Sequence, residues 1–340
     1  MFFVPVVNQQ NQPLMPTTLL RARRWIELKK ATPFWKKGIF CVRLNQDPSD
    51  NQKQDICAGV DPGSKREGFT LKSASHTYLN VLTETIDWVS KSLETRRIMR
   101  RARRQRNTRY RQARFDNRRG SFLPPSTKAR WQWKLRILNW LMKMFPITHV
   151  CCEDVSAKTK KNARKWNVMF SPLEVGKNWF YGEIKKTWKL ETMEGWQTKE
   201  LRDALGLKKS SSKLADKFEC HNVDSWVLAN SIVGGHIKPE NKKLIKLIPL
   251  RFHRRQLHYF QFSKGGERKN YGGTSSLGFK RGSLVKHKKY GLVYVGGTSN
   301  DRISVHSLET GKRLSTKVRV EDCRFRTYLS ERSCRLSSPC

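Results

Sequence analysis

Twelve arginines crowd into the 24 residues from Arg96 to Arg119, and this run constrains the fold of the 340-residue chain more than any other feature. It reads RRIMRRARRQRNTRYRQARFDNRR, with no lysine and a single acid, Asp116. A helix is predicted, ended by Gly120. Arginines on every side of a helix cannot pack in a core, but their planar guanidinium groups can bind phosphates in several directions. We therefore expect this helix to face a polyanion.

The net charge points to the same kind of partner. The chain has 69 Lys and Arg against 28 Asp and Glu, a net charge of +41, and a pI near 10.4. Each phosphate that a protein neutralises releases counterions and adds to affinity, so nucleic acid is the expected partner. A merely solvated basic surface fits poorly, because so many uncompensated charges repel one another and oppose compaction. We expect complete folding only with the partner bound.

Several other classes of protein are disfavoured. No apolar run reaches the roughly 18–20 residues that a membrane helix needs, so no membrane partner is expected. The opening MFFVPVV lacks the basic region and long apolar stretch of a signal peptide. The eight cysteines form no CxxC pair, which argues against a zinc ribbon. Buried, reduced thiols and a cytosolic setting are expected instead.

The pattern of apolar residues predicts an α/β domain around the arginine run. The expected elements are strands 56–60, 68–72 and 78–86, a helix 127–145, a strand 148–155 and a helix 213–233. Residues 156–215 read as irregular, with short helices near 172–186 and 198–205. Short strands between glycine-rich turns over 282–320 are typical of a small β-barrel.

Three carboxylates occupy positions that suit metal-dependent nuclease chemistry. Asp61 ends the first expected strand, Glu153 lies on a later strand, and Asp224 lies on a later helix. His221 precedes Asp224 by three residues, so both lie on one helical face. Hard oxygen ligands suit Mg²⁺, and such a cluster can hold two ions about 4 Å apart across a scissile phosphate. His221 has the unperturbed pKa of a base for an attacking water.

Each of these residues also has a plainer interpretation. Asp61 precedes Pro-Gly and could form a turn, and Glu153-Asp154 could be an exposed strand end. His221 could be an ordinary helical histidine with satisfied hydrogen bonds. Spacing does not decide whether Glu153 alone, or Asp154 too, would touch metal. The ordered set of strand Asp, strand Glu and helical His-x-x-Asp favours the catalytic interpretation.

These motifs carry a family resemblance. CAGVDPGSKREGF, VCCEDVSA and CHNVDSWVLAN resemble the three split segments of a RuvC nuclease domain. The arginine run between the first two resembles the bridge helix of RNA-guided DNA nucleases. Gln12-Pro13-Leu14-Met15-Pro16 resembles the PLMP signature that opens the IscB group of transposon-encoded nucleases, and Arg254-Arg255-Gln256-Leu257-His258 resembles that group too. The resemblance covers nearly the whole chain in order.

One departure indicates the subgroup. IscB proteins carry an HNH nuclease between the second and third RuvC segments, yet no histidine occurs here between Asp154 and Cys220. The chain therefore resembles the IsrB group, which has RuvC but no HNH. That resemblance implies an RNA-guided nickase that uses Mg²⁺, a long structured guide RNA and a double-stranded DNA target with an adjacent motif. RuvC would cut the displaced non-target strand.

The resemblance also implies residue roles and a cellular setting. Catalysis would fall to Asp61, Glu153, His221 and Asp224, with metal held by the three carboxylates and no organic cofactor. The candidates for clamping the guide RNA are Arg96, Arg97, Arg100, Arg101, Arg103, Arg104, Arg106 and Arg109. We expect a monomer in a ribonucleoprotein, in a bacterial or archaeal cytoplasm and at the nucleoid when on target.

The expected fold is α/β: a ribonuclease-H-like (RuvC) mixed-sheet nuclease domain split by an arginine-rich bridge helix, with a small N-terminal module and a C-terminal β-rich module. The expected division is 1–55 PLMP module, 56–91 RuvC segment I, 92–120 bridge helix, 121–190 RuvC segment II, 191–250 RuvC segment III and 251–340 β-rich module. By resemblance, the last would read the motif beside the target.

Two other functions stay open at the level of sequence. A protein-only nuclease of ribonuclease-H-like fold, such as a junction resolvase or transposase, would explain the carboxylates but not the arginine helix. The guided nuclease TnpB usually carries paired CxxC motifs, which are absent here. A non-catalytic protein that binds structured RNA would explain the charge but would leave the three carboxylates unexplained.

Overall fold

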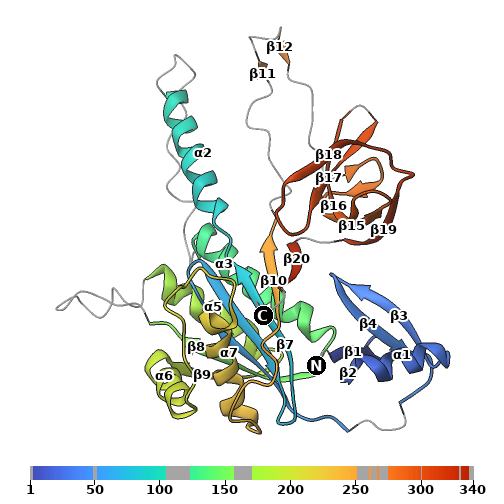
Figure 1. Ribbon diagram of the computed structural model, residues 1–340. Coiled ribbons are helices and arrows are strands. Elements are labelled where there is room, and N and C mark those ends of the chain that lie inside the picture. The colour runs from blue at the N-terminus through green and yellow to red at the C-terminus, as the bar shows by residue number, and fades with distance from the viewer. Residues whose placement is uncertain are drawn as a thin grey trace.

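A seven-stranded mixed sheet forms the centre of the protein, seen here in a computed structural model (Figure 1). The structure describes residues 3–48, 52–104, 123–156, 171–250, 260–261, 266–267, 275–299, 301–328 and 331–336. The strands of the central sheet are β5 (Ile56–Asp61), β6 (Arg66–Lys72), β7 (Thr77–Glu84), β8 (Ile147–Asp154), β9 (Lys189–Glu194), β10 (Leu244–Pro249) and β20 (Glu331–Leu336).

The order and direction of these strands define the fold. Across the sheet the order is β20-β10-β7-β6-β5-β8-β9. The hairpins join β5, β6 and β7 antiparallel, whereas β8 pairs parallel with β5, and β9 parallel with β8. Numbered by their order in the chain, the five strands β7-β6-β5-β8-β9 therefore lie in the sheet as 3-2-1-4-5. Strand 2, which is β6, runs antiparallel to the other four. That is the ribonuclease-H-like arrangement of RuvC proteins, so the predicted fold class is confirmed.

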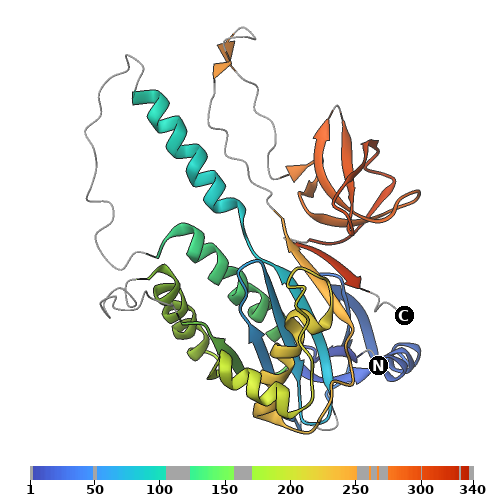
Figure 2. The same cartoon turned by 60° about the vertical axis from the view of Figure 1, so that its left-hand side comes forward.

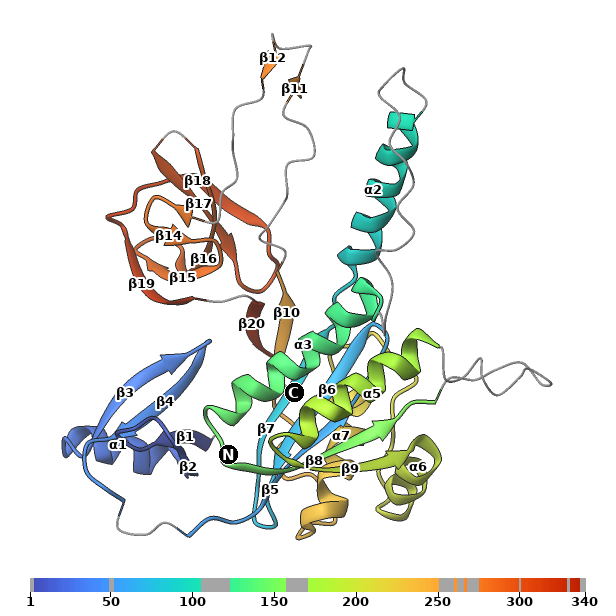
Figure 3. The ribbon, with the colours of Figure 1, turned by 180° about the vertical axis from the view of Figure 1, so that it is seen from behind.

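Helices cover both faces of this sheet (Figure 3). They are α3 (Pro125–Met142), α5 (Pro172–Lys185), α6 (Gly195–Ala204) and α7 (Phe218–Val233). Ile56, Ala58 and Val60 of β5 pack in one apolar cluster with residues of α3, whereas Cys57 packs with Leu228 of α7. Because both faces are covered, every residue of β5 is buried.

Local sequence sets where these helices begin and end. Ser171 caps α5, because its hydroxyl accepts a hydrogen bond of 3.2 Å from the amide of Leu173. Pro172 follows at the first helical position, where a missing amide hydrogen costs nothing. Gly234 follows the end of α7 with φ of 64°, a conformation that favours glycine.

The arginine run begins in a helix that projects from the body of the protein. This helix is α2 (Trp88–Arg104), and it stands clear of the sheet in two views (Figures 1 and 2). The predicted continuation to residue 119 lies outside the described residues. Arg96, Arg97, Arg100 and Arg101 are all exposed. None of these four forms an ion pair with another residue in the described part of the chain.

The N-terminal module is a small sheet with one helix. Its elements are β1 (Phe3–Val7), β2 (Pro13–Thr18), α1 (Leu19–Glu27), β3 (Ala31–Lys36) and β4 (Ile39–Leu44), and its strand order is β2-β1-β4-β3. The PLMP segment forms most of strand β2 at the edge of this sheet, where the missing amide hydrogens of Pro13 and Pro16 are tolerated.

The C-terminal module is a five-stranded antiparallel sheet of order β18-β17-β16-β15-β19. Its strands are β15 (Ser283–His287), β16 (Gly291–Ser299), β17 (Arg302–Ser307), β18 (Arg313–Val318) and β19 (Cys323–Tyr328), preceded by the short hairpins β11 (Phe260–Gln261) with β12 (Gly266–Glu267) and β13 (Ser275–Ser276) with β14 (Phe279–Lys280). Val285, Val295 and Val305 form its core, as the alternating pattern predicts.

Two details differ from the sequence-based expectation. Residues 156–215 were predicted as irregular with short helices, but they also contain β9, whose side chains are mostly exposed and give no strong apolar pattern. The last strand, β20, pairs with β10 rather than with the C-terminal module, so residues 331–336 return to the central sheet. A strand pattern does not reveal which sheet the strand joins.

None of the described helices is both long and apolar enough to cross a membrane.

Candidate active site

Three carboxylates from three distant segments of the chain meet beside the carboxyl ends of the inner strands β5 and β8. Asp61 is the last residue of β5, and Glu153 lies near the end of its parallel neighbour β8. Parallel neighbours present their carboxyl ends at the same edge, which brings these two side chains together. Asp224 reaches them from α7, and ligand oxygens of all three lie within 4.8 Å of one another. Asp61 and Asp224 are buried, and Glu153 is partly exposed.

Two glycines let α7 lie close enough to complete this cluster. A Cβ atom on Gly59 would lie 1.8 Å from the carbonyl oxygen of Ser225, and one on Gly68 would lie 2.6 Å from that of His221. Both distances are shorter than any real contact, so larger residues would force the helix outward. The glycines of β5 and β6 therefore set the distance between Asp61 on the sheet and Asp224 on the helix.

Basic side chains partly offset the negative charge of Asp224. Arg202 of α6 donates from Nη1 to Oδ1 at 2.6 Å, and the Lys209 ammonium contacts Oδ2. Lys209 lies on the loop between α6 and α7, which Asp216 ties to the sheet through ion pairs with Arg66 and Lys246. The loop therefore holds a cation against the carboxylate cluster.

Burial and the two neighbouring carboxylates raise the pKa of Glu153 to about 7. Burial makes the largest contribution, because it disfavours the charged carboxylate, and the negative charges of Asp61 and Asp224 add to it. Lys209 opposes the shift. Because burial and two neighbouring carboxylates disfavour a charged Glu153, that side chain favours a neutralising partner, either a proton or a metal cation.

His221 is held between two acceptors. Its Nδ1 lies 2.8 Å from Oδ2 of Asp61, and its Nε2 lies 3.0 Å from the carbonyl oxygen of Lys213. Burial lowers the pKa of His221, but the hydrogen bond and charge of Asp61 outweigh that effect and raise it. With an ionised Asp61, both ring nitrogens donate in this arrangement, which the imidazolium form satisfies. The ring becomes a free base only when one acceptor turns elsewhere.

Asp154 points away from the cluster. Its Oδ1 accepts a hydrogen bond of 3.1 Å from Tyr181 and forms an ion pair of 2.8 Å with Lys177, both on α5. Neighbouring residues on a strand face opposite sides of the sheet, so Glu153 faces α7 and Asp154 faces α5. Of the adjacent pair that the sequence left undecided, Glu153 is the one in the carboxylate group.

The predicted guide-binding arginines lie apart from this cluster, on and beyond α2. Arg96, Arg97, Arg100 and Arg101 are exposed on the helix, and Arg103 and Arg104 are near and at its end. Arg106 and Arg109 lie outside the described residues. Sequence reasoning missed Arg202 and Lys209, because nothing in a lysine-rich segment distinguishes the cations that fold back onto a carboxylate.

Comparison with known proteins gives one family match. A family model described as RRXRR protein matches residues 4–166, just under half of the chain. The matched span includes the PLMP segment, Asp61, the arginine run and Glu153, and the chain reads Arg100-Arg101-Ala102-Arg103-Arg104 within it. No curated protein matches the chain.

Two solved structures of Holliday junction proteins are similar to part of the chain. Thermus thermophilus RuvC in complex with its Holliday junction substrate is 12% identical, with a TM-score of 0.29, and the match covers 53% of this chain and 97% of that chain. The yeast mitochondrial Holliday junction resolvase Ydc2 is 12% identical, with a TM-score of 0.27, over 53% of this chain and 78% of that chain. The strand order described above, rather than these scores, defines the RuvC-type fold.

Proposed function

We propose that the protein is an RNA-guided DNA endonuclease that nicks the displaced, non-target strand of its target. The observation that carries this proposal is the convergence of Asp61, Glu153 and Asp224 within 4.8 Å on a ribonuclease-H-like sheet. The sequence between the first two runs through the projecting arginine helix α2. A carboxylate cluster supports nuclease chemistry, and the helix supports a bound nucleic acid that is not the one being cut.

The three carboxylates fit a hard divalent cation, Mg²⁺ above all. The three donors are all carboxylate oxygens, and they lie close enough together to bind the same ion. The pKa of Glu153 is raised because that carboxylate is buried beside two others, so it favours a neutralising partner. We assign Asp61, Glu153 and Asp224 as the metal ligands. When bound, one or two such ions would neutralise the scissile phosphate and lower the pKa of water.

The remaining polar residues then have defined roles. His221 orients the carboxylate of Asp61 through its 2.8 Å contact. Once the Asp61 oxygen has another partner, the pKa of His221 falls and the ring releases its Nδ1 proton to solvent, after which Nδ1 can accept a proton from the attacking water. Lys209 stands beside the cluster on a tethered loop, where its charge can pair with a phosphate oxygen of the strand.

The arginine helix supports the guide-RNA part of the proposal. Four exposed arginines of α2 have no carboxylate partner among the described residues, and the helix that carries them projects from the nuclease body (Figure 2). Uncompensated guanidinium groups in such a position suit a folded RNA backbone on several sides. We therefore assign α2 as the clamp for guide RNA, in line with the sequence resemblance.

A single nuclease centre supports nicking rather than double-strand cleavage. No histidine lies between Asp154 and Cys220, so the sequence leaves no HNH site there. The described part of this interval forms α5, β9 and α6, which belong to the nuclease domain itself. One carboxylate cluster then cuts one strand, and the strand paired with guide RNA stays intact.

The test uses the full chain expressed with the DNA that flanks its gene. We expect one long, discrete RNA to co-purify, and supercoiled plasmid matching its variable end to become nicked, not linear, in Mg²⁺. Asp61→Ala should abolish nicking while RNA is retained, and Asp154→Asn serves as the matched control that keeps nicking. Cutting without RNA would assign a protein-only nuclease, and a mixed RNA population with no cutting would assign an RNA-binding protein.

A further inference from the structure

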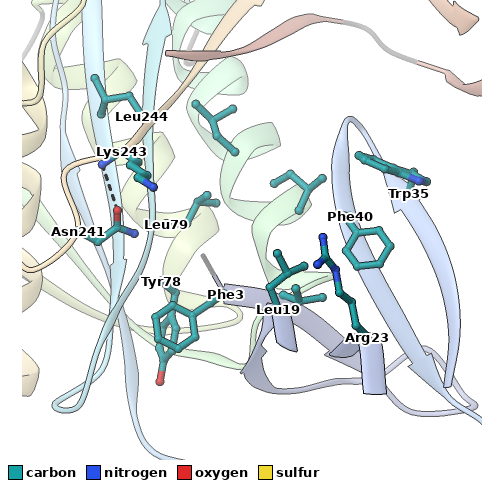
Figure 4. Close-up of a pocket in the computed structure, with 13 residues that line it drawn as sticks. Phe3, Leu19, Arg23, Trp35, Phe40, Tyr78, Leu79, Asn241, Lys243 and Leu244 are labelled. Carbon is teal, nitrogen blue, oxygen red and sulfur yellow. Dashed lines mark hydrogen bonds between the residues drawn. The ribbon is translucent and has the colours of Figure 1, made fainter. Parts of the chain in front are cut away.

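A cavity of about 430 Å³ separates the N-terminal module from the central sheet. Figure 4 shows its two walls, with Phe40, Trp35 and Arg23 on one side and Leu79 and Lys243 on the other. The volume lies within the range of sites that hold small molecules and single nucleotides. The described residues that line it are mostly apolar, and charged groups lie at its margin.

Aromatic rings gather at this cavity in two pairs. Phe3 and Tyr78 meet edge to face with ring centroids 5.1 Å apart, and Trp35 and Phe40 do so at 5.5 Å. Tyr78 is buried, but Trp35 is 48% exposed. An exposed indole beside an open apolar cavity offers a flat surface on which another ring can stack.

The charge around the cavity favours an anionic occupant. Residues 3–48 contain eight Lys and Arg against two carboxylates. Arg23 is exposed, and its guanidinium lies beside Phe40 at the cavity (Figure 4). Lys243 is exposed on the opposite wall. Aromatic walls between two cations match a nucleotide, whose base is apolar on both faces and whose phosphates are negative.

The cavity lies on the other face of the central sheet from the carboxylate cluster. Asp61 pairs with Gly68, and Gly68 pairs with Leu82, so the candidate active site is level with the end of β7. Leu79 of the cavity lies three residues earlier on β7, roughly 10 Å back along the strand. Leu79 also packs against the apolar core on the face of the sheet that α3 covers, whereas Asp224 lies on the opposite face, which α7 covers. A nucleotide here therefore cannot occupy the cutting site at the same time.

We propose that this cavity binds an unpaired base of the RNA that the protein carries, stacked on Trp35, with the adjoining phosphates held by Arg23 and Lys243. RNA loops present splayed, unpaired bases, whereas target DNA is a duplex outside its displaced strand. The cavity would thus fix one position of the guide RNA against both the N-terminal module and the nuclease sheet. The inference rests on the RNA-binding part of the proposed function and not on its chemistry.

The first test maps the contact in the full chain purified with whatever RNA co-purifies from cells grown with 4-thiouridine. After irradiation and digestion, we expect crosslinked nucleotide on peptides that contain Phe3, Trp35 or Phe40. The second test measures affinity for that RNA. Trp35→Ala should weaken binding roughly five- to 150-fold, and Arg23→Ala should lower the salt slope by about 0.7. Leu20→Ala, exposed on α1 but outside the cavity lining, is the control.

Each outcome decides the question, whether or not the protein cuts DNA. Crosslinks confined to other peptides, together with equal affinity of Trp35→Ala and Leu20→Ala, would overturn the proposal. A crosslink to the cavity from DNA carrying 4-thiothymidine, but not from RNA, would overturn the assignment to RNA. A Trp35→Ala protein that melts earlier but keeps its RNA affinity would mean that the cavity serves folding. Loss of nicking with an intact crosslink would leave this inference standing.

Discussion

Replacing Gly59 by alanine tests whether the approach of α7 to the sheet sets the geometry of the carboxylate cluster. The new Cβ would lie 1.8 Å from the carbonyl oxygen of Ser225 and 2.9 Å from the amide nitrogen of Ala229. Both contacts are backbone atoms, so no side chain can rotate away. Non-bonded atoms need roughly 3.5 Å, so α7 must retreat by on the order of 1.5 Å.

That retreat has two consequences of predictable size. Overpacking of this kind costs about 1–3 kcal/mol of unfolding free energy. The same helix carries His221 and Asp224, which would move away from Asp61 on the sheet. A misplacement of about 1 Å costs on the order of 100-fold in rate, so nicking should fall by at least that factor. Affinity for Mg²⁺ should fall with it.

The assay compares Gly59→Ala with Gly182→Ala in plasmid nicking, Mg²⁺ titration calorimetry and thermal melting. Gly182 lies in α5 with nothing within 4 Å of an added Cβ, so alanine there should stabilise the protein by about 0.5–1 kcal/mol and leave nicking unchanged. If Gly59→Ala keeps full activity and an unchanged melting temperature, the close approach does not position the cluster. Should Gly59→Ala fail to fold, Gly68→Ala, with a milder contact of 2.6 Å, takes its place.

Four further predictions follow from contacts of buried charged groups. Glu153→Gln should abolish Mg²⁺ binding by calorimetry, whereas Asp154→Asn should retain it, because Asp154 faces Tyr181 instead of the cluster. Because Glu153 has a pKa near 7, affinity for Mg²⁺ should fall about tenfold per pH unit below pH 7 and level off above it. In metal-free protein the unfolding free energy should fall as the pH rises from 4.5 to 7, because the folded state holds the Glu153 proton more tightly than the unfolded state does. An unfolding free energy that rises over this pH range would contradict the raised pKa of Glu153. Finally, Lys134→Met should lower the unfolding free energy by about 3–5 kcal/mol, because the fully buried Glu67 carboxylate loses its partner at 2.7 Å. The double variant Glu67→Leu with Lys134→Met should recover most of that loss, as measured by urea unfolding.

The arginine helix and the three carboxylates could be found in the sequence because their residue types are rare in such positions. An acid at the end of a buried strand and a His-x-x-Asp pair on a helix stand out locally. The ion pair between Glu67 and Lys134 could not be found, because 67 residues separate its partners. The same holds for the contacts of Arg202 and Lys209 with Asp224, since a cation in a lysine-rich segment carries no local mark of its partner.

The amino-acid sequence was enough to predict the α/β class, the chain order of most strands and helices, a polyanionic partner and the candidate carboxylates Asp61, Glu153 and Asp224, with Asp154 left open beside Glu153. Periodicity, charge and residue type express these locally, so they can be read without knowing contacts. The packed structure was needed to show that Glu153 rather than Asp154 faces the cluster, that His221 is held between two acceptors, and that an aromatic cavity opens between Trp35 and Tyr78. These depend on the side of a strand that each residue faces and on the distance between separate segments, and both are set when the sheet and helices pack together.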